Sequence, residues 1–126
     1  MLTSSKKAKG RSLQNLVVKK ILETFNGRLL QHDVRSTAMG QSGSDIQLSS
    51  HARDVVDCSF ECKSHAAFSV YKHWSQTTAN SNGLHPVLVI KQNNSKPLAV
   101  IDLDFLMQLL FYKDKIERDR KSTRLN

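Results

Sequence analysis

Three charged residues in the middle of the chain have the types and the spacing that chemistry on an anionic substrate requires. Asp45 lies where a glycine-containing loop meets a short apolar segment, and Glu61 and Lys63 lie two residues apart in the segment SFECKS. Residues two apart in a β-strand project from the same face, so a carboxylate and an ammonium would stand side by side on a rigid platform. We therefore expect these three side chains to form the chemical centre of the protein.

This set of residues suits metal-assisted cleavage of a phosphodiester. Mg²⁺ prefers oxygen ligands, usually one or two carboxylates, and a bound ion both polarises a phosphate and activates water. Asp45 and Glu61 are the candidate metal ligands, with the backbone carbonyl of Cys62 as a further oxygen, and Lys63 can stabilise developing negative charge. The expected cofactor is Mg²⁺ or Mn²⁺. The spacing alone is a weak signal, because a Glu and a Lys two apart also occur on solvated strand faces.

Hydrophobic periodicity indicates the elements that must position these residues. Apolar side chains recur at helical spacing early in the chain, at Leu13, Leu16, Val17, Ile21 and Phe25. A later continuous apolar run, residues 86–90, is typical of a central strand. The expected elements are, in chain order, a helix over about 11–25, short strands over about 32–36 and 45–48, a strand over 56–63, a helix over about 66–80, strands over 86–90 and 98–101, and a third helix after a cap at Asp102 or Asp104.

The strand that carries Glu61 and Lys63 alternates between apolar and polar residues. Its expected apolar face consists of Val56, Cys58, Phe60 and Cys62, and its expected polar face of Asp57, Ser59, Glu61 and Lys63. The Cys62 side chain should therefore point into the core. In the following helix we expect Tyr71 and Trp74, at helical spacing, to pack in the core rather than to stack on bases.

The element pattern predicts a mixed α/β fold with helices flanking a mixed central β-sheet, in the order α-β-β-β-α-β-β-α. The chain has 126 residues, 39% hydrophobic and 24% charged, which suits a single globular domain over residues 1–126. No linker or internal repeat divides it. The basic ends, about 1–9 and 118–126, are expected to be flexible.

The net charge of +8 is concentrated at the two ends of the chain. Lys6, Lys7, Lys9 and Arg11 precede any acidic residue, whereas residues 21–112 carry seven basic and eight acidic side chains. Basic ends on a nearly neutral body suit a polyanion such as DNA, and the alternative explanation is solubility or a lysine-rich disordered tail. The sequence has no apolar run long enough to span a membrane and no signal peptide pattern. Its two cysteines are expected to be reduced, so we expect a cytoplasmic protein.

The segments GRSLQN, DVRSTAMGQSGSDIQL and SFECKS resemble the small PD-(D/E)xK endonucleases of phages, and they are similar to the archaeal Holliday junction resolvases. The resemblance covers roughly residues 9–104. It implies a restriction-endonuclease-like core, with Asp45, Glu61 and Lys63 as the catalytic set. It also implies a metal-dependent endonuclease, acting in a phage-infected bacterial host.

The chain departs from this family pattern at several positions. Ser44 replaces the proline that gives the family its name, which is not a ligand. The resolvases place a glutamate on the first helix, and by register that position is Gln14, which can hydrogen-bond a water at the metal but carries no charge. Glu23 on the same helix is the alternative, about two and a half turns further on. Gln76 fits weakly a polar position on the helix after the ExK strand.

Further residues are candidates for contacts with DNA. Arg35, Ser36, Gln41 and Ser42 flank the loop that leads into Asp45, where an arginine offers paired donors to phosphate. The basic residues of the N-terminus would neutralise phosphates without reading sequence. A zinc site at Cys58, Cys62 and His65 is disfavoured because the spacing lacks a paired-cysteine motif.

The leading hypothesis is therefore a structure-selective DNA endonuclease that acts on branched DNA such as four-way junctions. We expect a homodimer, because cutting two strands needs two sites, with the third helix or the hairpin strands as the interface. The alternatives are a sequence-specific restriction or homing endonuclease on the same fold, and a catalytically inactive DNA-binding protein.

Overall fold

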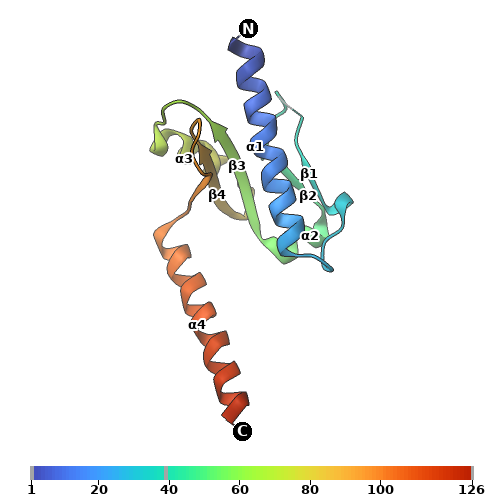
Figure 1. The fold of residues 1–126 in the computed structure, drawn as a ribbon, viewed down its shortest axis with the longest axis vertical. Coiled ribbons are helices and arrows are strands. Elements are labelled where there is room, and N and C mark those ends of the chain that lie inside the picture. Colours follow the sequence, from blue (N-terminus) through green and yellow to red (C-terminus); the bar gives the residue numbers. More distant parts are fainter. Residues whose placement is uncertain (1, 39, 126) are drawn as a thin grey trace.

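The computed structural model describes residues 2–38 and 40–125, with side chains described for residues 5–38 and 40–122. Its helices, strands and one 3-10 turn alternate along the chain (Figure 1). The elements are α1 (Leu2–Thr24), the turn η1 (Gln31–Asp33), β1 (Val34–Ser36), β2 (Ile46–Leu48), α2 (Ser50–Val56), β3 (Cys58–Ser64), α3 (Val70–Ala79), β4 (His85–Lys91), β5 (Leu98–Val100) and α4 (Leu103–Leu125).

The strands form two small sheets that meet beside Asp45. The antiparallel hairpin β1–β2 is one sheet, and the other has the order β3-β4-β5, with β3 and β4 parallel and β4 and β5 antiparallel. The Asp45 amide donates to the Phe60 carbonyl over 3.2 Å, which places the start of β2 along the free edge of β3. The mixed α/β class is therefore confirmed, with the sheet divided in two.

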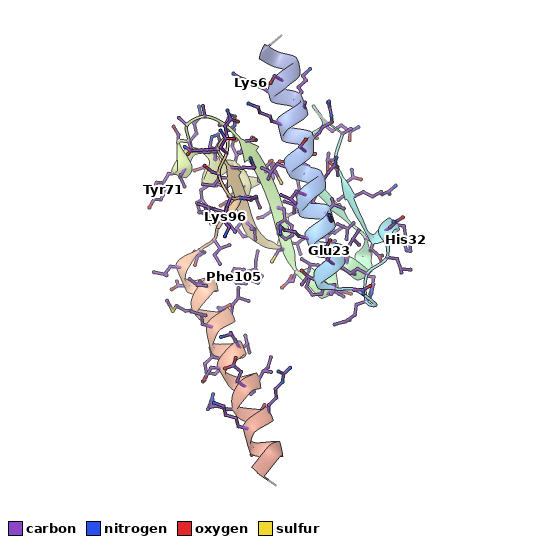
Figure 2. The ribbon with its side chains drawn as sticks, in the orientation of Figure 1. Lys6, Glu23, His32, Tyr71, Lys96 and Phe105 are labelled. Atoms are coloured by element: carbon purple, nitrogen blue, oxygen red, sulfur yellow. The ribbon has the colours of Figure 1, made fainter. Side chains whose placement is uncertain are left out.

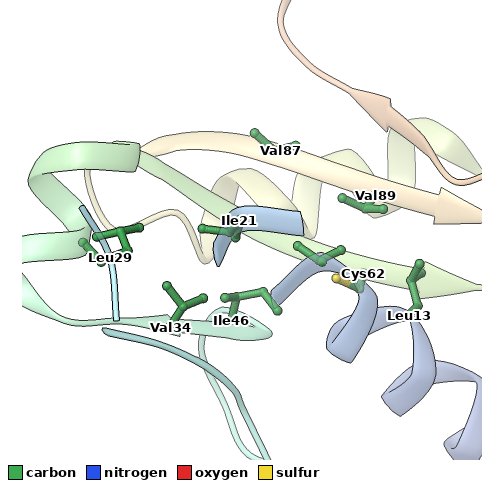
Figure 3. Close-up of a cluster of buried hydrophobic side chains, with 10 residues drawn as sticks. Leu13, Ile21, Leu29, Val34, Ile46, Cys62, Val87 and Val89 are labelled. Carbon is green, nitrogen blue, oxygen red and sulfur yellow. The ribbon is translucent and has the colours of Figure 1, made fainter. Parts of the chain in front are cut away.

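The core lies between α1 and the sheets. Leu13 and Ile21 point from α1 toward the apolar face of β3, where Cys62 is buried, and β4 adds Val87 and Val89 (Figure 3). Val17 of α1 belongs to the same buried cluster. The hairpin supplies the remaining buried side chains, Val34 and Ile46. The apolar periodicity of residues 13–21 thus packs as predicted, because it presents one stripe to the sheet.

The third strand begins later than expected because a short helix precedes it. Ser49 caps α2 by accepting a hydrogen bond from the Ala52 amide over 3.1 Å, and the helix ends at Asp57, whose φ of 55° is left-handed. Residues 49–54 were expected to form a turn or an extra helical turn, and they form part of this helix, which the expected order of elements did not include. Val56 belongs to α2 rather than to the strand. A serine cap and a left-handed terminal residue were sufficient to complete two helical turns.

The polar face of β3 is covered rather than solvated. Ser59 and Glu61 are each only 5% exposed, and both contact Asn80 at the end of α3. Helices α1 and α3 therefore lie on opposite faces of this strand. The expected burial of Tyr71 was wrong, since that side chain is 86% exposed, and Thr77 is the buried residue of α3.

Both ends of the chain, expected to be flexible, are helical over the described residues. Helix α1 starts at Leu2 rather than near residue 11, and α4 continues to Leu125. Asp102, one of the two predicted caps, accepts hydrogen bonds from the amides of Asp104 and Phe105. Helix α4 then leaves the body of the molecule instead of flanking the sheet (Figure 1). Within the described residues, no helix has the length and apolar content that crossing a membrane requires.

Candidate active site

Asp45 is fixed by hydrogen bonds on both sides of the junction between the two sheets. Its carbonyl accepts from the Thr37 amide over 2.8 Å, and its carboxylate atom Oδ2 accepts from the Cys62 amide over 2.7 Å. The preceding Ser44 donates through its hydroxyl to the Phe60 carbonyl over 2.9 Å. The carboxylate of Asp45 is thus held against β3 at the level of Glu61 and Lys63, although 17 residues separate it from Cys62.

Glu61 is the other carboxylate of the pair. Its pKa is raised to about 7, mainly by burial and additionally by the adjacent Asp45 carboxylate through a shared hydrogen bond and charge repulsion. Two groups oppose this: the Asn80 amide donates to Oε2 over 3.2 Å, and the ammonium of Lys63 attracts the charged form. The three residues predicted from the sequence are therefore brought together, with the two acids in direct contact.

Cys62 contributes its backbone rather than its side chain. The side chain is 7% exposed and packs in the core, as predicted, and burial raises the pKa of its thiol. In a β-strand the amide and the carbonyl of one residue project from the same edge, and the Cys62 amide points at Asp45. The Cys62 carbonyl therefore lies on the edge of β3 that faces the Asp45 carboxylate.

Gln14 is placed near this junction, and Glu23 is not. The Gln14 side chain is 4% exposed and accepts a hydrogen bond from the Ser36 hydroxyl over 2.5 Å. Ser36 pairs in register with Ile46, the residue that follows Asp45. Glu23 lies at the far end of α1 from Lys6 (Figure 2), where it is exposed and pairs with Lys19 over 3.9 Å. The geometry thus favours Gln14 as the helix residue of the site.

Gln76 does not contact either carboxylate in the structure. It lies exposed on α3, and its backbone carbonyl accepts from the Asn80 amide. Asn80, one helical turn later, is the residue that reaches Glu61. The sequence indicated a polar residue from this helix but not which turn would lie over β3. Asn80 was missed because Asn-Gly pairs and polar residues near a helix end also mark a turn.

A hollow beside the carboxylates has a mixed polar and apolar lining. Its volume is about 360 Å³, and Ser44, Ser59 and Asn80 line it together with Arg53 from α2. Arg53 was not among the predicted contacts, since a single arginine in a short helix gives no pattern. Its guanidinium would bring positive charge to a cavity bordered by Ser44, which precedes Asp45, and by Asn80, which contacts Glu61.

The predicted phosphate contacts separate into four groups. Arg35 and Ser42 line a second hollow of about 420 Å³ together with Thr37 and Ser44, close to Asp45. Ser36 is directed inward instead, since its hydroxyl donates to Gln14. Lys6, Lys7, Lys9 and Arg11 are exposed along the N-terminal half of α1, where Lys9 borders a groove of about 810 Å³ that also contacts Lys91. Gln41 is exposed in the loop.

The donor set fits a hard divalent cation. Two carboxylates in contact repel each other, and a cation between them relieves that repulsion. Among the described residues no three His, Cys, Asp or Glu side chains converge into a complete cage. A set of two carboxylates plus a backbone carbonyl leaves positions for water, which suits Mg²⁺ better than a metal that demands four protein side chains.

Comparisons of the chain with protein-family profiles, with curated proteins and with solved structures gave no match. The function is therefore inferred from the residues themselves and from their geometry.

Proposed function

We propose that the protein is a metal-dependent DNA endonuclease of the PD-(D/E)xK type, built on a restriction-endonuclease-like core. The observation that supports this most strongly is the contact between Asp45 and Glu61, two acids from different segments held together beside Lys63. A structural role would pair each acid with a cation. Here burial and the neighbouring Asp45 carboxylate together raise the pKa of Glu61 to about 7, so Asn80 and Lys63 do not fully offset the cost of holding both acids charged.

Asp45, Glu61 and the Cys62 carbonyl are the groups that would hold Mg²⁺ or Mn²⁺. When bound there, the cation would polarise a phosphate oxygen and lower the pKa of a water molecule. The hydrogen bond from the Cys62 amide keeps the Asp45 carboxylate in position before any ligand arrives. Asn80 performs the same task for Glu61, because it donates to Oε2 and so favours the charged carboxylate that a cation requires.

Lys63 and Gln14 act on the reacting phosphate and water. Lys63 projects from the same face of β3 as Glu61, so its ammonium can stabilise negative charge that develops on the phosphate. Gln14 is anchored by Ser36 and can orient a water by hydrogen bonding. Because Gln14 is uncharged, Asp45 and Glu61 are the two anionic ligands that the proposed site contains.

The surrounding cations would position the DNA backbone. Arg35 and Ser42 on one side of the Ser44–Asp45 junction, and Arg53 on the other, border the two hollows beside the site. The lysines of α1 extend this positive surface toward the N-terminus (Figure 2, where Lys6 is labelled). Contacts of this kind neutralise phosphates and fix register without reading bases.

A surface that contacts phosphates favours recognition of DNA shape over recognition of sequence. We therefore infer branched DNA, such as a four-way junction, as the preferred substrate, and a homodimer as the acting form, since paired incisions need two sites. Cytoplasm of a phage-infected bacterium is the compartment that the family resemblance favours. A sequence-specific restriction or homing endonuclease and an inactive DNA-binding protein are the alternatives on the same fold.

A cleavage assay across DNA structures tests the proposal. The protein is incubated with linear duplex, single strands and a four-way junction of matched sequence, each with Mg²⁺ or with EDTA. Paired symmetric nicks in the junction that require Mg²⁺ are expected. Cleavage of linear duplex at one discrete site would support the sequence-specific alternative. Binding to DNA without cleavage of any substrate would overturn the enzymatic proposal.

A further inference from the structure

Helix α4 exposes more apolar surface than a monomeric protein normally carries. Large apolar side chains on this helix are between 37% and 66% exposed, at Leu103, Leu106, Met107, Leu109, Leu110, Phe111, Tyr112 and Ile116. Its first turn touches the body through Phe105, whose ring stacks on that of His85 at a centroid distance of 4.1 Å. The rest of the helix points away from the molecule (Figure 1). Contiguous apolar surface of this kind marks an interaction site.

The apolar residues of α4 occupy nearly its whole circumference. Within residues 103–112 the polar side chains are Asp104 and Gln108, which are four apart and so form one narrow stripe. A helix that is apolar on all other sides requires a partner that surrounds it. Beyond residue 112 the helix is charged and carries internal ion pairs, Lys113 with Glu117 and Asp114 with Arg118. The segment to be covered is therefore 103–112.

The body of the chain carries a groove whose lining is mainly apolar, like the exposed surface of α4. It has a volume of about 410 Å³ and lies between α1 and the β4–β5 hairpin. Leu16 from α1 and Phe25, which follows that helix, form one wall, Leu98 forms the other, and Phe60 and Val87 belong to the floor. Leu98 is 61% exposed, so this groove is open to a ligand. Two walls and a floor can cover a helix on three sides, which a flat surface cannot.

The same chain does not fill its own groove. Two residues, Ile101 and Asp102, separate β5 from α4, and the Asp102 cap fixes the direction in which the helix leaves the sheet. The stacking of Phe105 on His85 holds the first turn in that direction. A short connection of this kind favours exchange of the helix between two chains over folding back within one.

We propose that residues 103–112 of α4 dock in the groove of a second copy of the chain, so that two chains exchange their C-terminal helices. The seven large, partly exposed side chains of residues 103–112 amount to roughly 700 Å² per chain, close to the ~800 Å² that a standard interface buries on each partner. Lys20 and Lys96 line the groove, where they can pair with Asp104 on the polar stripe of the incoming helix. This specifies the homodimer included in the proposed function, but it does not depend on nuclease activity.

The oligomeric state in EDTA, without DNA, tests this proposal. Sedimentation equilibrium should give a dimer for the wild type at about 10 μM, and Leu110→Asp should weaken dimerisation at least about 100-fold. Gln108→Asp, which places the same charge on the polar stripe, should leave the dimer intact. Circular dichroism confirms folding, since Leu110 is already exposed. A monomeric wild type, or a Leu110→Asp variant as dimeric as wild type, would overturn the proposal.

A groove variant separates helix exchange from simple pairing of two α4 helices. Leu98→Asp should dissociate the dimer to the same extent as Leu110→Asp, because it removes the wall on which the helix packs. Asn94→Asp, in the turn of the same hairpin and outside the groove, is the matched control. A dimer that survives Leu98→Asp and is lost in Leu110→Asp would show that the helices pair with each other and would contradict docking in the groove. Junction cleavage measured in parallel keeps a failure of this interface distinct from a failure of the enzyme proposal.

Discussion

The Cys62 amide donates a hydrogen bond of 2.7 Å to Asp45 Oδ2, and this bond ties the first acid of the site to the strand that carries the second. Asp45 lies immediately before β2 and Glu61 lies in β3 of the other sheet, yet the bond fixes the Asp45 carboxylate beside Glu61 without a ligand. The repulsion between the two acids contributes to the raised pKa of Glu61. The site is thus organised in advance, and it is strained in the direction that a divalent cation would relieve.

The raised pKa of Glu61 predicts that the metal-free protein loses stability as the pH rises. The pKa is about 7 in the folded chain against 4.5 for an ordinary glutamate, so unfolding releases a proton between these values. Stability therefore falls as the pH rises from about 4.5 to 7, by up to about 3 kcal/mol, and Glu61→Gln removes this loss. Denaturant titrations in EDTA at pH 4.5 and pH 8 measure the free energy of unfolding.

The exposed Glu23→Gln is the matched control for this stability prediction. It should retain the pH dependence of the wild type. If Glu61→Gln and wild type lose the same stability between the two pH values, the interpretation of Glu61 as a strained acid is wrong.

The hydrogen bond from Asn80 to Glu61 predicts that removing Asn80 shifts the pH dependence of cleavage. Its amide donates to Glu61 Oε2 and lowers the pKa of that carboxyl, so Asn80→Ala should raise the pKa further. At pH 7 the variant should cleave about threefold to tenfold more slowly than wild type, with activity recovered as the pH rises. Gln76→Ala, one helical turn away, should follow the wild-type profile. Equal losses at every pH would instead indicate a structural defect in Asn80→Ala.

Substitutions of Gln14 and of Glu23 should have different effects, because only one of these two residues of α1 lies close to the site. Gln14 is buried against Ser36 near Asp45, whereas Glu23 is exposed at the other end of α1. Gln14→Ala should reduce cleavage by about 10-fold to 100-fold, the usual range for a residue that supports a metal site. Glu23→Ala should remain within about twofold of wild type by the same reasoning. The reverse order of effects would transfer the role to Glu23.

The lysines and arginine of α1 predict a defined dependence of DNA binding on salt. In EDTA, the logarithm of the affinity for DNA should fall linearly with the logarithm of the salt concentration. The magnitude of this slope should decrease by about 0.9 for each phosphate contact that a substitution removes. Lys9→Gln combined with Arg11→Gln should thus reduce the slope by about 1.8. Arg28→Gln combined with Lys72→Gln removes the same charge from other exposed positions. If both double variants change the slope equally, net charge rather than α1 determines binding.

Local patterns in the sequence were sufficient to predict the elements that bury apolar residues. The stripe from Leu13 to Ile21 and the apolar run of β4 each have one energetically favourable arrangement, so periodicity alone locates them. The alternation of β3 likewise predicted that Cys62 would point into the core and that Glu61 and Lys63 would share a face. These outcomes follow from strand geometry, which does not depend on the rest of the fold.

Contacts between distant segments could not be predicted in this way. Asn80 reaches Glu61 because α3 crosses β3 at one particular turn, and Gln76, a turn earlier, has the same chemistry and no contact. The burial of Glu61 is another such case, since an alternating strand gives no sign that a helix end covers its polar face. The projection of α4 is a third, because its apolar residues predict burial but not the chain that provides it.

Cleavage of a labelled four-way junction by acid-to-amide variants tests the central claim most directly. Wild type should cleave in Mg²⁺ and not in EDTA, while Asp45→Asn and Glu61→Gln should lose at least about 1,000-fold in rate and still bind the junction in EDTA. Asp54→Asn, an exposed acid on α2, should cleave within about twofold of wild type, since it lies outside the proposed metal ligands. Wild-type cleavage by Asp45→Asn or Glu61→Gln would contradict the assignment of these two carboxylates as the metal site.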